Sequence, residues 1–320
     1  MEQQTISVEE LKAAFGTYIG TNQKDILRLL TQPTVSEQHM TTVVSADLVY
    51  RASKAVIEDL VQGFQESWTP KGTTTFTPIS ILQRRHKIDL TFNPDKVFNT
   101  WLGFMTDEST DRKTWPITKY MIENLIIPKV QSNRETKLIG TGKYEEPVEG
   151  TPQVVGKSMD GFCTILKELK ASGDSRINFI DLEPLTLDNI FDQVEAFSMA
   201  VDELYQSVEM EVFLSRKWYA AYHRKRRDLH GLDQNYTPEK SLIEGTAMTL
   251  VPLPSMKGEN IMFTTPKENF IRLLNRNNGA SNLSIESIDR QIKVFADWHE
   301  SVGFGIQEAI FAYVPGQGSL

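Results

Sequence analysis

The sequence predicts an α+β fold in two lobes with an N-terminal extension, on three observations. Apolar residues recur at helical spacing in several separate segments of the first two thirds. A stretch rich in threonine and proline interrupts these segments, and much of the last third alternates apolar and polar residues as strands do. With 320 residues, of which 40% are hydrophobic and 24% charged, the chain is long enough to bury a substantial core.

The N-terminal residues, up to about position 40, are predicted to form an arm. Ser7 and Glu10 have the spacing of a capping box at the start of a short helix. A second short helix passes through Ile26 and Leu30, and Pro33 ends it. Helices this short are marginally stable in water, so we expect the arm to need a surface to lie on, such as that of another subunit.

A helix is predicted over residues 46–64, where apolar residues recur three or four positions apart. The next segment differs, because the prolines and threonines of residues 66–78 favour extended backbone. Ile88, Leu90 and Phe92 then alternate with polar residues as in a strand. We therefore expect a long two-stranded loop. Since such a ribbon is barely stable alone, it is expected to lie on a neighbour.

A long helix is predicted over residues 115–139. Pro116 suits its first turn, and Pro128 is expected to bend it or break a turn. The run Gly140-Thr141-Gly142 is expected to end the helix. Residues 143–157 contain Pro and Gly at turn-forming positions and are predicted to be a loop.

The second half is predicted to begin with helices over residues 188–204 and 216–230 and a strand between them, near residues 208–214. The last third is expected to be mostly β. Extended segments are predicted at residues 248–254, 261–266, 291–298 and 309–314, with a turn at Asn277-Asn278-Gly279.

Composition limits the classes of function. A net charge of −8 argues against a main role in gripping nucleic acid over a broad surface, although a local basic patch remains compatible with it. The single cysteine, Cys163, cannot form an internal disulfide, fits a reducing cytoplasm and is expected to be buried. The N-terminus lacks the pattern of a signal peptide, and no apolar stretch approaches the ~18 residues of a membrane span.

Catalytic motifs are not found in the sequence. Its five histidines lack metal-ligand spacing, and no nucleophile elbow or phosphate-binding loop occurs. Gly303-Phe304-Gly305 carries only part of a dinucleotide-binding signature and is better explained as a bend between closing strands. The sequence therefore predicts no catalytic residue, no metal site and no cofactor.

Two clusters of basic residues have alternative interpretations. Arg224, Lys225, Arg226 and Arg227 follow His223 and would either contact nucleic acid phosphates or form a solvated face at a helix C-terminus, where cations suit the helix dipole. Residues 84–87 would either meet an acidic neighbour or protect an edge strand by charge. The intersubunit contacts predicted from the sequence are Trp68, Phe76, Arg84, Arg85 and Lys87.

The order of these parts resembles the capsid fold of tailed bacteriophages, named after phage Hong Kong 97 and shared with herpesvirus capsids and encapsulins. The resemblance covers most of residues 40–315. Residues 116–142 resemble the spine helix, residues 188–204 a helix of the axial domain, residues 212–219 the strand-to-helix step after it, residues 245–263 the returning strands and residues 295–314 the closing strands.

The resemblance implies an α+β fold with an N-terminal arm, an extended β loop, a spine helix, and peripheral and axial domains. The implied divisions are 1–62 (arm and first helix), 63–98 (extended loop), 99–160 (peripheral domain with the spine helix), 161–260 (axial domain) and 261–320 (closing strands shared by both domains). Some relatives cross-link a loop lysine to an asparagine. Lys71 lies in the loop here, but no asparagine matches, so no cross-link is expected.

The implied function is that of a major capsid protein, which self-assembles through pentamers and hexamers into an icosahedral shell. Its implied partners are itself, packaged double-stranded DNA through non-specific contacts, and portal, scaffold or decoration proteins, with no membrane and no cofactor. The implied location is the virion, assembled in the cytoplasm of a bacterial host. Two alternatives remain open: an encapsulin-type nanocompartment shell and an unrecognised soluble enzyme.

Overall fold

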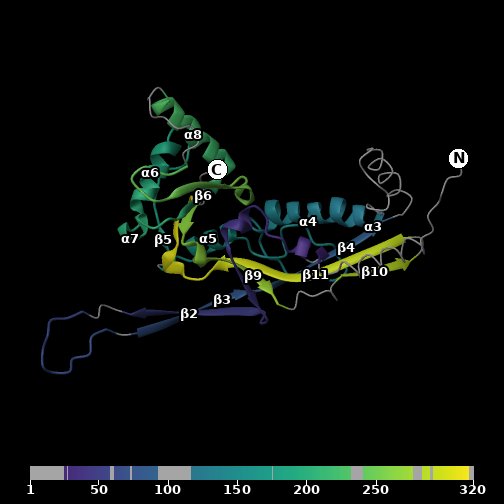
Figure 1. Cartoon of the computed structure of the whole chain (residues 1–320), viewed down its shortest axis with the longest axis horizontal. Coiled ribbons are helices and arrows are strands. Elements are labelled where there is room, and N and C mark those ends of the chain that lie inside the picture. Colours follow the sequence, from purple (N-terminus) through teal and green to yellow (C-terminus); the bar gives the residue numbers. More distant parts are fainter. Residues whose placement is uncertain are drawn as a thin grey trace.

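The chain folds into two five-stranded sheets, a separate two-stranded ribbon and several helices in the computed structural model (Figure 1). A long helix lies along the larger sheet, a lobe that carries the other labelled helices stands at one end of it, and the ribbon projects outward. The structure describes residues 25–26, 28–57, 61–72, 74–92, 117–174, 176–231, 241–276, 283–288 and 291–316.

The larger sheet is organised around one long strand, β11. The first part of β11 pairs antiparallel with β10 and β4, and its last part pairs antiparallel with β9, which in turn pairs parallel with β1. The strand predicted at residues 291–298 is therefore confirmed and continues for six more residues. The strands are β1 (Thr41–Ser45), β4 (Arg84–Phe92), β9 (Phe270–Asn275), β10 (Leu283–Ile288) and β11 (Gln291–Phe304).

The predicted long helix is confirmed over the residues that the structure describes. Its backbone is helical without interruption but alternates between α and π geometry. The segments are α3 (Ile117–Tyr120), the π-helical η2 (Met121–Ile126), α4 (Ile127–Asn133) and the π-helical η3 (Arg134–Leu138). Pro128 stands in the first turn of α4, directly after the π-helical turn. Because proline has no N–H group, this change of geometry is consistent with the predicted disturbance. Pro116 lies outside the described residues.

The smaller sheet has the strand order β5-β12-β8-β6-β7 and forms the lobe together with the remaining helices. Its strands are β5 (Asn178–Phe179), β6 (Glu211–Ser215), β7 (Thr249–Leu253), β8 (Met262–Thr265) and β12 (Phe311–Tyr313). Its helices are α5 (Phe162–Ala171), α6 (Ile190–Ala200), α7 (Glu203–Gln206) and α8 (Arg216–His230). Short 3₁₀ helices are η1 (Ser36–His39), η4 (Pro254–Met256), η5 (Lys267–Asn269) and η7 (Gln307–Ala309).

Most predictions for this half are confirmed. Helices α6 and α8 and strands β6, β7, β8 and β12 lie within or close to the predicted ranges, while α5, β1, β9 and β10 were not predicted. An aromatic cluster joins the two sheets, because Phe162 of α5 packs against Phe263 of β8 and Phe270 of β9. Cys163 is fully buried beside it, as expected. The turn predicted at residues 277–279 lies outside the described residues.

The prediction of a helix over residues 46–64 is wrong. The structure has a strand there, β2 (Val49–Ile57), which pairs antiparallel with β3 (Thr74–Leu82) over nine residue pairs. Strand structure is favoured by the residue types at Val49, Tyr50, Val56 and Ile57. Pairing with β3 provides the hydrogen bonds to the backbone N–H and C=O groups that a helix would have provided locally. The apolar spacing fitted a helix, but the cross-strand pairing outweighed that local pattern.

The returning strand of the ribbon was also assigned wrongly. Ile88, Leu90 and Phe92 belong to β4, which pairs with β11 in the larger sheet, whereas β3 is the strand that returns. Only Gln83 separates β3 from β4. At this point the Gln83 N–H donates to the Leu48 carbonyl at 2.7 Å, and Asn275 Nδ2 donates to Gln83 Oε1 at 2.7 Å. The base of the ribbon is thus joined to the sheet through a short connection.

The run that ends the long helix packs tightly against the rest of the chain. A Cβ added to Gly140 would lie 2.1 Å from the Ser255 carbonyl oxygen of η4, which is far inside van der Waals contact. Nearby, a Cβ on Gly161 would lie 2.4 Å from the Gly140 carbonyl oxygen. The predicted stop at residues 140–142 is confirmed, and close backbone contact explains why glycine stands at position 140.

We expect Gly140→Ala to lower the free energy of unfolding by about 1–3 kcal/mol, because the added methyl group forces η4 away from the helix end. Chemical denaturation followed by circular dichroism would measure this. Gly63→Ala is the matched control, because a Cβ there meets no atom within 4 Å. Equal stability of the two variants would contradict the tight contact.

Candidate functional site

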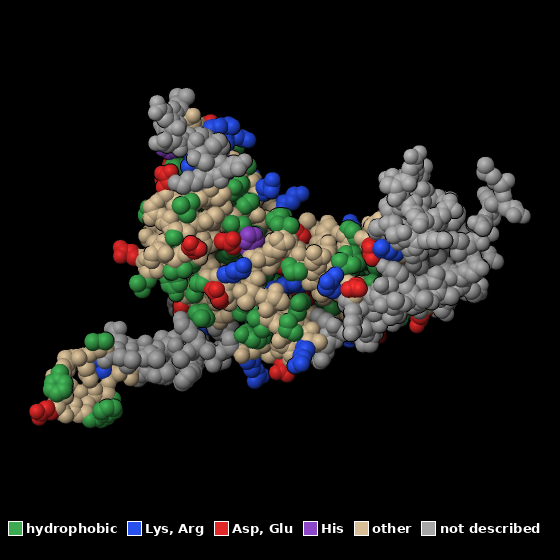
Figure 2. Space-filling view, viewed as in Figure 1, with side chains coloured by type: hydrophobic (Ala, Val, Ile, Leu, Met, Phe, Trp, Pro, Cys, Tyr) green, Lys and Arg blue, Asp and Glu red, His purple; other side chains and the backbone are tan. Residues whose placement is uncertain are grey.

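The ribbon ends in a tip, residues 61–72, that presents large apolar side chains to solvent (Figures 1 and 2). Val61 is 90% exposed, Phe64 96% and Trp68 91%. Nine residue pairs at about 3.3 Å per residue make the paired part of the ribbon roughly 30 Å long. Exposed apolar groups of this size mark interaction surfaces. The tip is therefore the first candidate functional site.

Local hydrogen bonds give the tip a defined shape although it has no core of its own. Lys71 Nζ donates to the Val61 carbonyl at 2.8 Å, and Gln62 Nε2 donates to the Thr69 carbonyl at 2.7 Å. Trp68, a predicted contact residue, lies at this tip. Phe76 is in β3, but its side chain lies outside the described residues.

The other predicted contact residues lie in β4, close to the body and away from the tip. The Arg84 guanidinium lies 3.5 Å from the centre of the Tyr144 ring, and Arg85 forms an ion pair with Asp297 of β11. Lys87 pairs with Asp89 at 2.6 Å. Each has a partner within the chain, which is compatible with the alternative role of charge on an edge strand.

A buried cluster of four charged residues, which the sequence did not predict, lies between the long helix and the larger sheet. It consists of Glu37, Arg134, Arg272 and Glu300, whose side chains are at most 2% exposed. Arg134 contacts both carboxylates, with Nη2 at 2.8 Å from Glu37 Oε1 and 2.6 Å from Glu300 Oε1. Arg272 Nε lies 2.9 Å from Glu300 Oε1 and 3.1 Å from Glu37 Oε1.

This charge cluster fixes the chain just after the N-terminal arm. Arg134 Nη1 donates to the carbonyls of Leu30 and Gln32 at 3.1 and 3.0 Å, and Arg272 Nη2 donates to the Thr31 carbonyl at 2.6 Å. The backbone N–H of Ser36 donates to Glu135 at 3.1 Å. Each contact joins residues 30–36 to the long helix or to β9, so this part of the chain is held against the body.

Burial, together with the charge of Glu300, raises the pKa of Glu37 to about 8, although Arg134 and Arg272 act in the opposite direction. Burial acts to raise the pKa of Glu300 too, but the charges of Arg134 and Arg272 outweigh it and hold this pKa well below its usual range. The two carboxyl groups thus share one proton at neutral pH. His86, which is stacked on Trp298 and contacts the Glu300 carbonyl, has its pKa lowered by burial.

These pKa shifts predict a pH dependence of stability. Unfolded histidines still bind part of a proton up to pH ~7.5, so His86 gives a small slope of opposite sign below that pH, whereas Glu37 holds a proton in the folded state that it releases on unfolding. Relative to Glu37→Gln, the free energy of unfolding should therefore fall as the pH rises from 6.5 to 8, by at most about 1.4 kcal/mol per pH unit. Denaturant titrations of Glu37→Gln should give no such slope, and parallel slopes in both proteins would contradict the assignment.

The structure divides the predicted basic patch on α8. Arg224 and Arg227 are exposed and Lys225 is half-buried, but Arg226 points inward and lies 3.8 Å from Glu244. Arg226 therefore does not belong to an exposed patch. Helical geometry explains this difference, because consecutive residues of α8 point in different directions. Arg226 lies on the same side of α8 as Trp218 and Tyr222, which are also buried.

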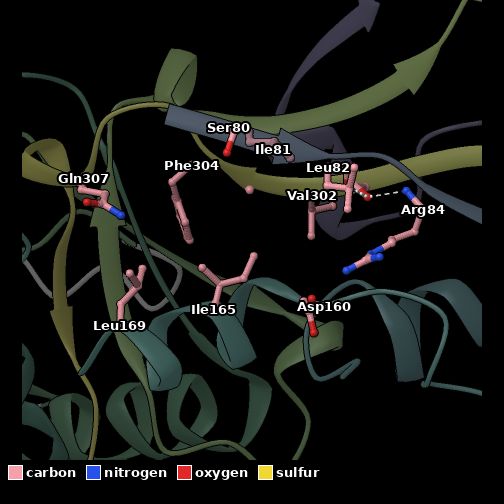
Figure 3. Close-up of a pocket in the computed structure, with 12 residues that line it drawn as sticks. Ser80, Ile81, Leu82, Arg84, Asp160, Ile165, Leu169, Val302, Phe304 and Gln307 are labelled. Carbon is pink, nitrogen blue, oxygen red and sulfur yellow. Dashed lines mark hydrogen bonds between the residues drawn. The ribbon is translucent and has the colours of Figure 1, made fainter. Parts of the chain in front are cut away.

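A groove of about 290 Å³ lies at the base of the ribbon, between the end of β3, the end of β11 and α5 (Figure 3). Its charged residues already have contacts, because Asp160 accepts the Tyr144 N–H at 2.8 Å and Arg84 stacks on the Tyr144 ring. These contacts give both side chains a structural role. The apolar lining residues are Ile81, Leu82, Ile165, Leu169, Val302 and Phe304.

Other reactive groups offer little chemistry in the part of the chain that the structure describes. Burial raises the pKa of the Cys163 thiol well above its usual value, so little of the nucleophilic thiolate forms. Among the described residues no three His, Cys, Asp or Glu side chains are grouped to hold a metal ion. Within the same residues, no helix is both long and apolar enough to cross a membrane.

Comparison with known proteins gives similarity in structure only. No family model and no curated sequence matches the chain. The solved structure of the procapsid of satellite phage P4, which includes the size determination protein, contains a chain that is similar over 96% of this chain and 97% of its own, with a TM-score of 0.58 at 11% identity. The capsid of Myoviridae phage XM1 matches with a TM-score of 0.50 at 11% identity, covering 88% of this chain and 91% of its own.

A structure of Gordonia phage Cozz also has a TM-score of 0.50, at 8% identity and over 88% of this chain and 86% of its own. At these identities the similarity concerns the fold. The chain therefore has the mixed helix-and-sheet fold found in chains of phage capsid structures, and this similarity extends over nearly its whole length.

Proposed function

We propose that this chain is the major capsid protein of a tailed bacteriophage, which assembles through pentamers and hexamers into an icosahedral shell around double-stranded DNA. The observation that carries the proposal is the exposed apolar tip on a ribbon about 30 Å long, in a chain with the fold of phage capsid subunits. In a lone subunit the tip exposes Phe64 and Trp68 to water, whereas in a shell a neighbour covers them.

The proposed mechanism is geometric. The ribbon and the N-terminal arm lie over neighbouring subunits, so segments that are marginally stable alone become intersubunit contacts. The charge cluster holds residues 30–32 against the body, and the long helix supports the sheet from which the ribbon projects. The peripheral domain would comprise residues 99–160, the axial domain residues 161–260, and the closing strands of both residues 261–320.

The partners follow from this role. The subunit would bind further copies of itself, contact the packaged DNA without sequence preference, and meet portal, scaffold or decoration proteins at specialised positions of the shell. It would reside in the virion after assembly in the bacterial cytoplasm. Trp68 at the tip and the charged residues of β4 would contribute intersubunit contacts.

Size-exclusion chromatography followed by negative-stain electron microscopy of the full chain tests the proposal. Closed shells, tubes, or rings of five and six subunits are the expected result. Nucleic acid inside the particles would support a virus capsid, whereas enclosed protein cargo would indicate a nanocompartment shell. A subunit that stays monomeric, even when co-expressed with the phage genes that neighbour its own, would overturn the proposal.

A further inference from the structure

The lobe formed around the smaller sheet is strongly divided in charge along the sequence. Residues 177–215, which include α6 and α7, contain nine acidic residues and no lysine or arginine. Residues 216–227, which make up most of α8, contain six lysine or arginine residues and no acidic residue. Such a separation is unusual for a single surface, because charges of opposite sign are normally interspersed.

The division is also spatial. Figure 2 shows acidic side chains at the edge of the lobe that carries α6 and α7, and basic side chains toward α8, which Figure 1 places on the other side of the lobe. On α6 and α7, Asp192, Asp202 and Glu203 are exposed. On α8, Arg216, Lys217, Arg224 and Arg227 are exposed, and their spacing places them on one helical face around Ala220.

Helix stability does not explain the cations at the start of α8, although Arg227 in the last turn suits the helix dipole. Arg216 and Lys217 stand in the first turn, where positive charge is unfavourable to the helix dipole. Arg216, Arg224 and Lys225 have no ion-pair partner among the described residues, whereas Arg85, Lys157 and Arg176 elsewhere on the surface each pair with an acid. Arg227 lies 3.8 Å from Asp228 and Lys217 lies over the Trp218 ring, so Arg216 and Arg224 are the residues of this cationic face most available for a partner with negative charge.

The acidic edge has the additional features of a protein interface. Large apolar side chains lie exposed among its acids: Leu187 is 56% exposed, Met199 55% and Leu204 80%. An apolar centre with a charged rim is typical of protein–protein contacts. The acidic edge and the cationic face are complementary in sign and belong to the same chain, so a second copy of this chain supplies the matching surface for each.

We propose that the cationic face of α8 in one copy docks on the α6–α7 edge of the next copy, so that copies associate head to tail. Since a head-to-tail contact that uses two different surfaces generates a ring when the rotation closes, the lobes would surround the axis of each pentamer and hexamer. This inference rests on the proposed function and names the surfaces that close the rings. Exposed charge pairs add little energy individually, but they select the partner surface and its register.

DNA is the competing partner for α8, because arginines also bind phosphate groups. Two observations favour a second copy. The net charge of −8 opposes the approach of a polyanion to the subunit, and the acidic edge offers a surface of matching sign together with exposed apolar residues.

Charge reversal with rescue tests the inference. One double variant, Arg224→Glu with Arg227→Glu, reverses the charge of these two positions on α8. A second, Asp192→Lys with Glu203→Lys, reverses the charge of two positions on the acidic edge. A quadruple variant combines both pairs. Particle formation is measured by sedimentation velocity and negative-stain microscopy over a range of protein concentrations. Each double variant should raise the concentration for half-assembly at least about tenfold, because like charges then face each other. The quadruple variant should return to within about threefold of the original protein.

The matched control is Lys129→Glu with Lys137→Glu, which changes the net charge equally on exposed positions of the long helix and should assemble normally. The inference is overturned if this control raises the concentration for half-assembly as much as the α8 variant does. It is also overturned if the quadruple variant needs as high a concentration for half-assembly as the double variants. Normal assembly of the α8 variant with loss of packaged double-stranded DNA would overturn it in favour of a DNA contact. Absence of particles from the unmodified chain would overturn the proposed function itself, before any variant is compared.

Discussion

Replacing Phe64 and Trp68 together by serine should abolish particle formation without destabilising the subunit. Both side chains are more than 90% exposed in the single chain, so their removal leaves the core unchanged. In an assembled shell every subunit contributes one tip, and large aromatic anchors at the centre of an interface each contribute about 2 kcal/mol or more. The loss is repeated at each intersubunit contact, so shells should disappear from electron micrographs at concentrations where the unmodified chain assembles.

A matched control separates this effect from a general loss of apolar surface. Val148 and Val154 are 71% and 72% exposed in the loop at residues 143–157, away from the ribbon. Their replacement by serine should leave assembly intact. Thermal unfolding of the dispersed subunits should give the same midpoint for both double variants. Normal shells from the tip variant would show that the ribbon tip is not an intersubunit contact.

The second large effect is expected at the buried charge cluster. Arg134→Met should lower the free energy of unfolding by about 3–5 kcal/mol, because the ionised Glu300 stays buried but loses a counter-charge, and the buried Glu37 loses its hydrogen-bond donor. The substitution also removes the donors to the carbonyls of Leu30 and Gln32. Denaturant unfolding followed by circular dichroism would measure the change in the free energy of unfolding.

Lys129→Met on the exposed side of the same long helix is the control and should change stability by no more than about 0.5 kcal/mol. If Arg134→Met changes the free energy of unfolding as little as Lys129→Met does, the charge cluster does not stabilise the fold. Replacing all four charged residues by apolar ones of similar size is expected to cost far less than Arg134→Met, because no unpaired charge then remains buried. That comparison distinguishes the loss of one partner from the net contribution of the cluster.

The sequence predicted those elements whose local pattern agrees with their final surroundings. Helix α8 is an example, since Trp218 and Tyr222 recur at helical spacing and Gly231 follows its last turn. Strand β2 is the opposite case, because Val49, Ala52 and Val56 have the spacing of one helical face but pair across a ribbon with β3. The decisive interaction there is with a segment that is distant in sequence, so no local window contains it.

The charge cluster was missed for a related reason. Glu37, Arg134, Arg272 and Glu300 come from four separate elements, and each alone is an ordinary charged residue. A weak signal was present in β9, where Arg272 interrupts the apolar run from Phe270 to Leu274. A charge in an otherwise apolar strand requires a buried partner, but the sequence does not identify that partner. Trp68 is a different case, because its place in a segment rich in threonine and proline led to its prediction as a contact residue, and its side chain is 91% exposed in the structure.

The short connection at Gln83 has a consequence for the curvature of the proposed shell. A single chain that occupies both five-fold and six-fold positions must present its ribbon at more than one angle, since the tilt between neighbours differs at the two positions. The ribbon is held by its own β2–β3 pairing and the sheet by the pairing of β4 with β11, so the link between Leu48 and Gln83 lies between two stiff units. Small rotations of the backbone at this link would move the tip by several ångströms without breaking the hydrogen bonds of either the β2–β3 or the β4–β11 pairing. The base of the ribbon can thus act as the pivot through which one sequence fits a closed surface of unequal angles.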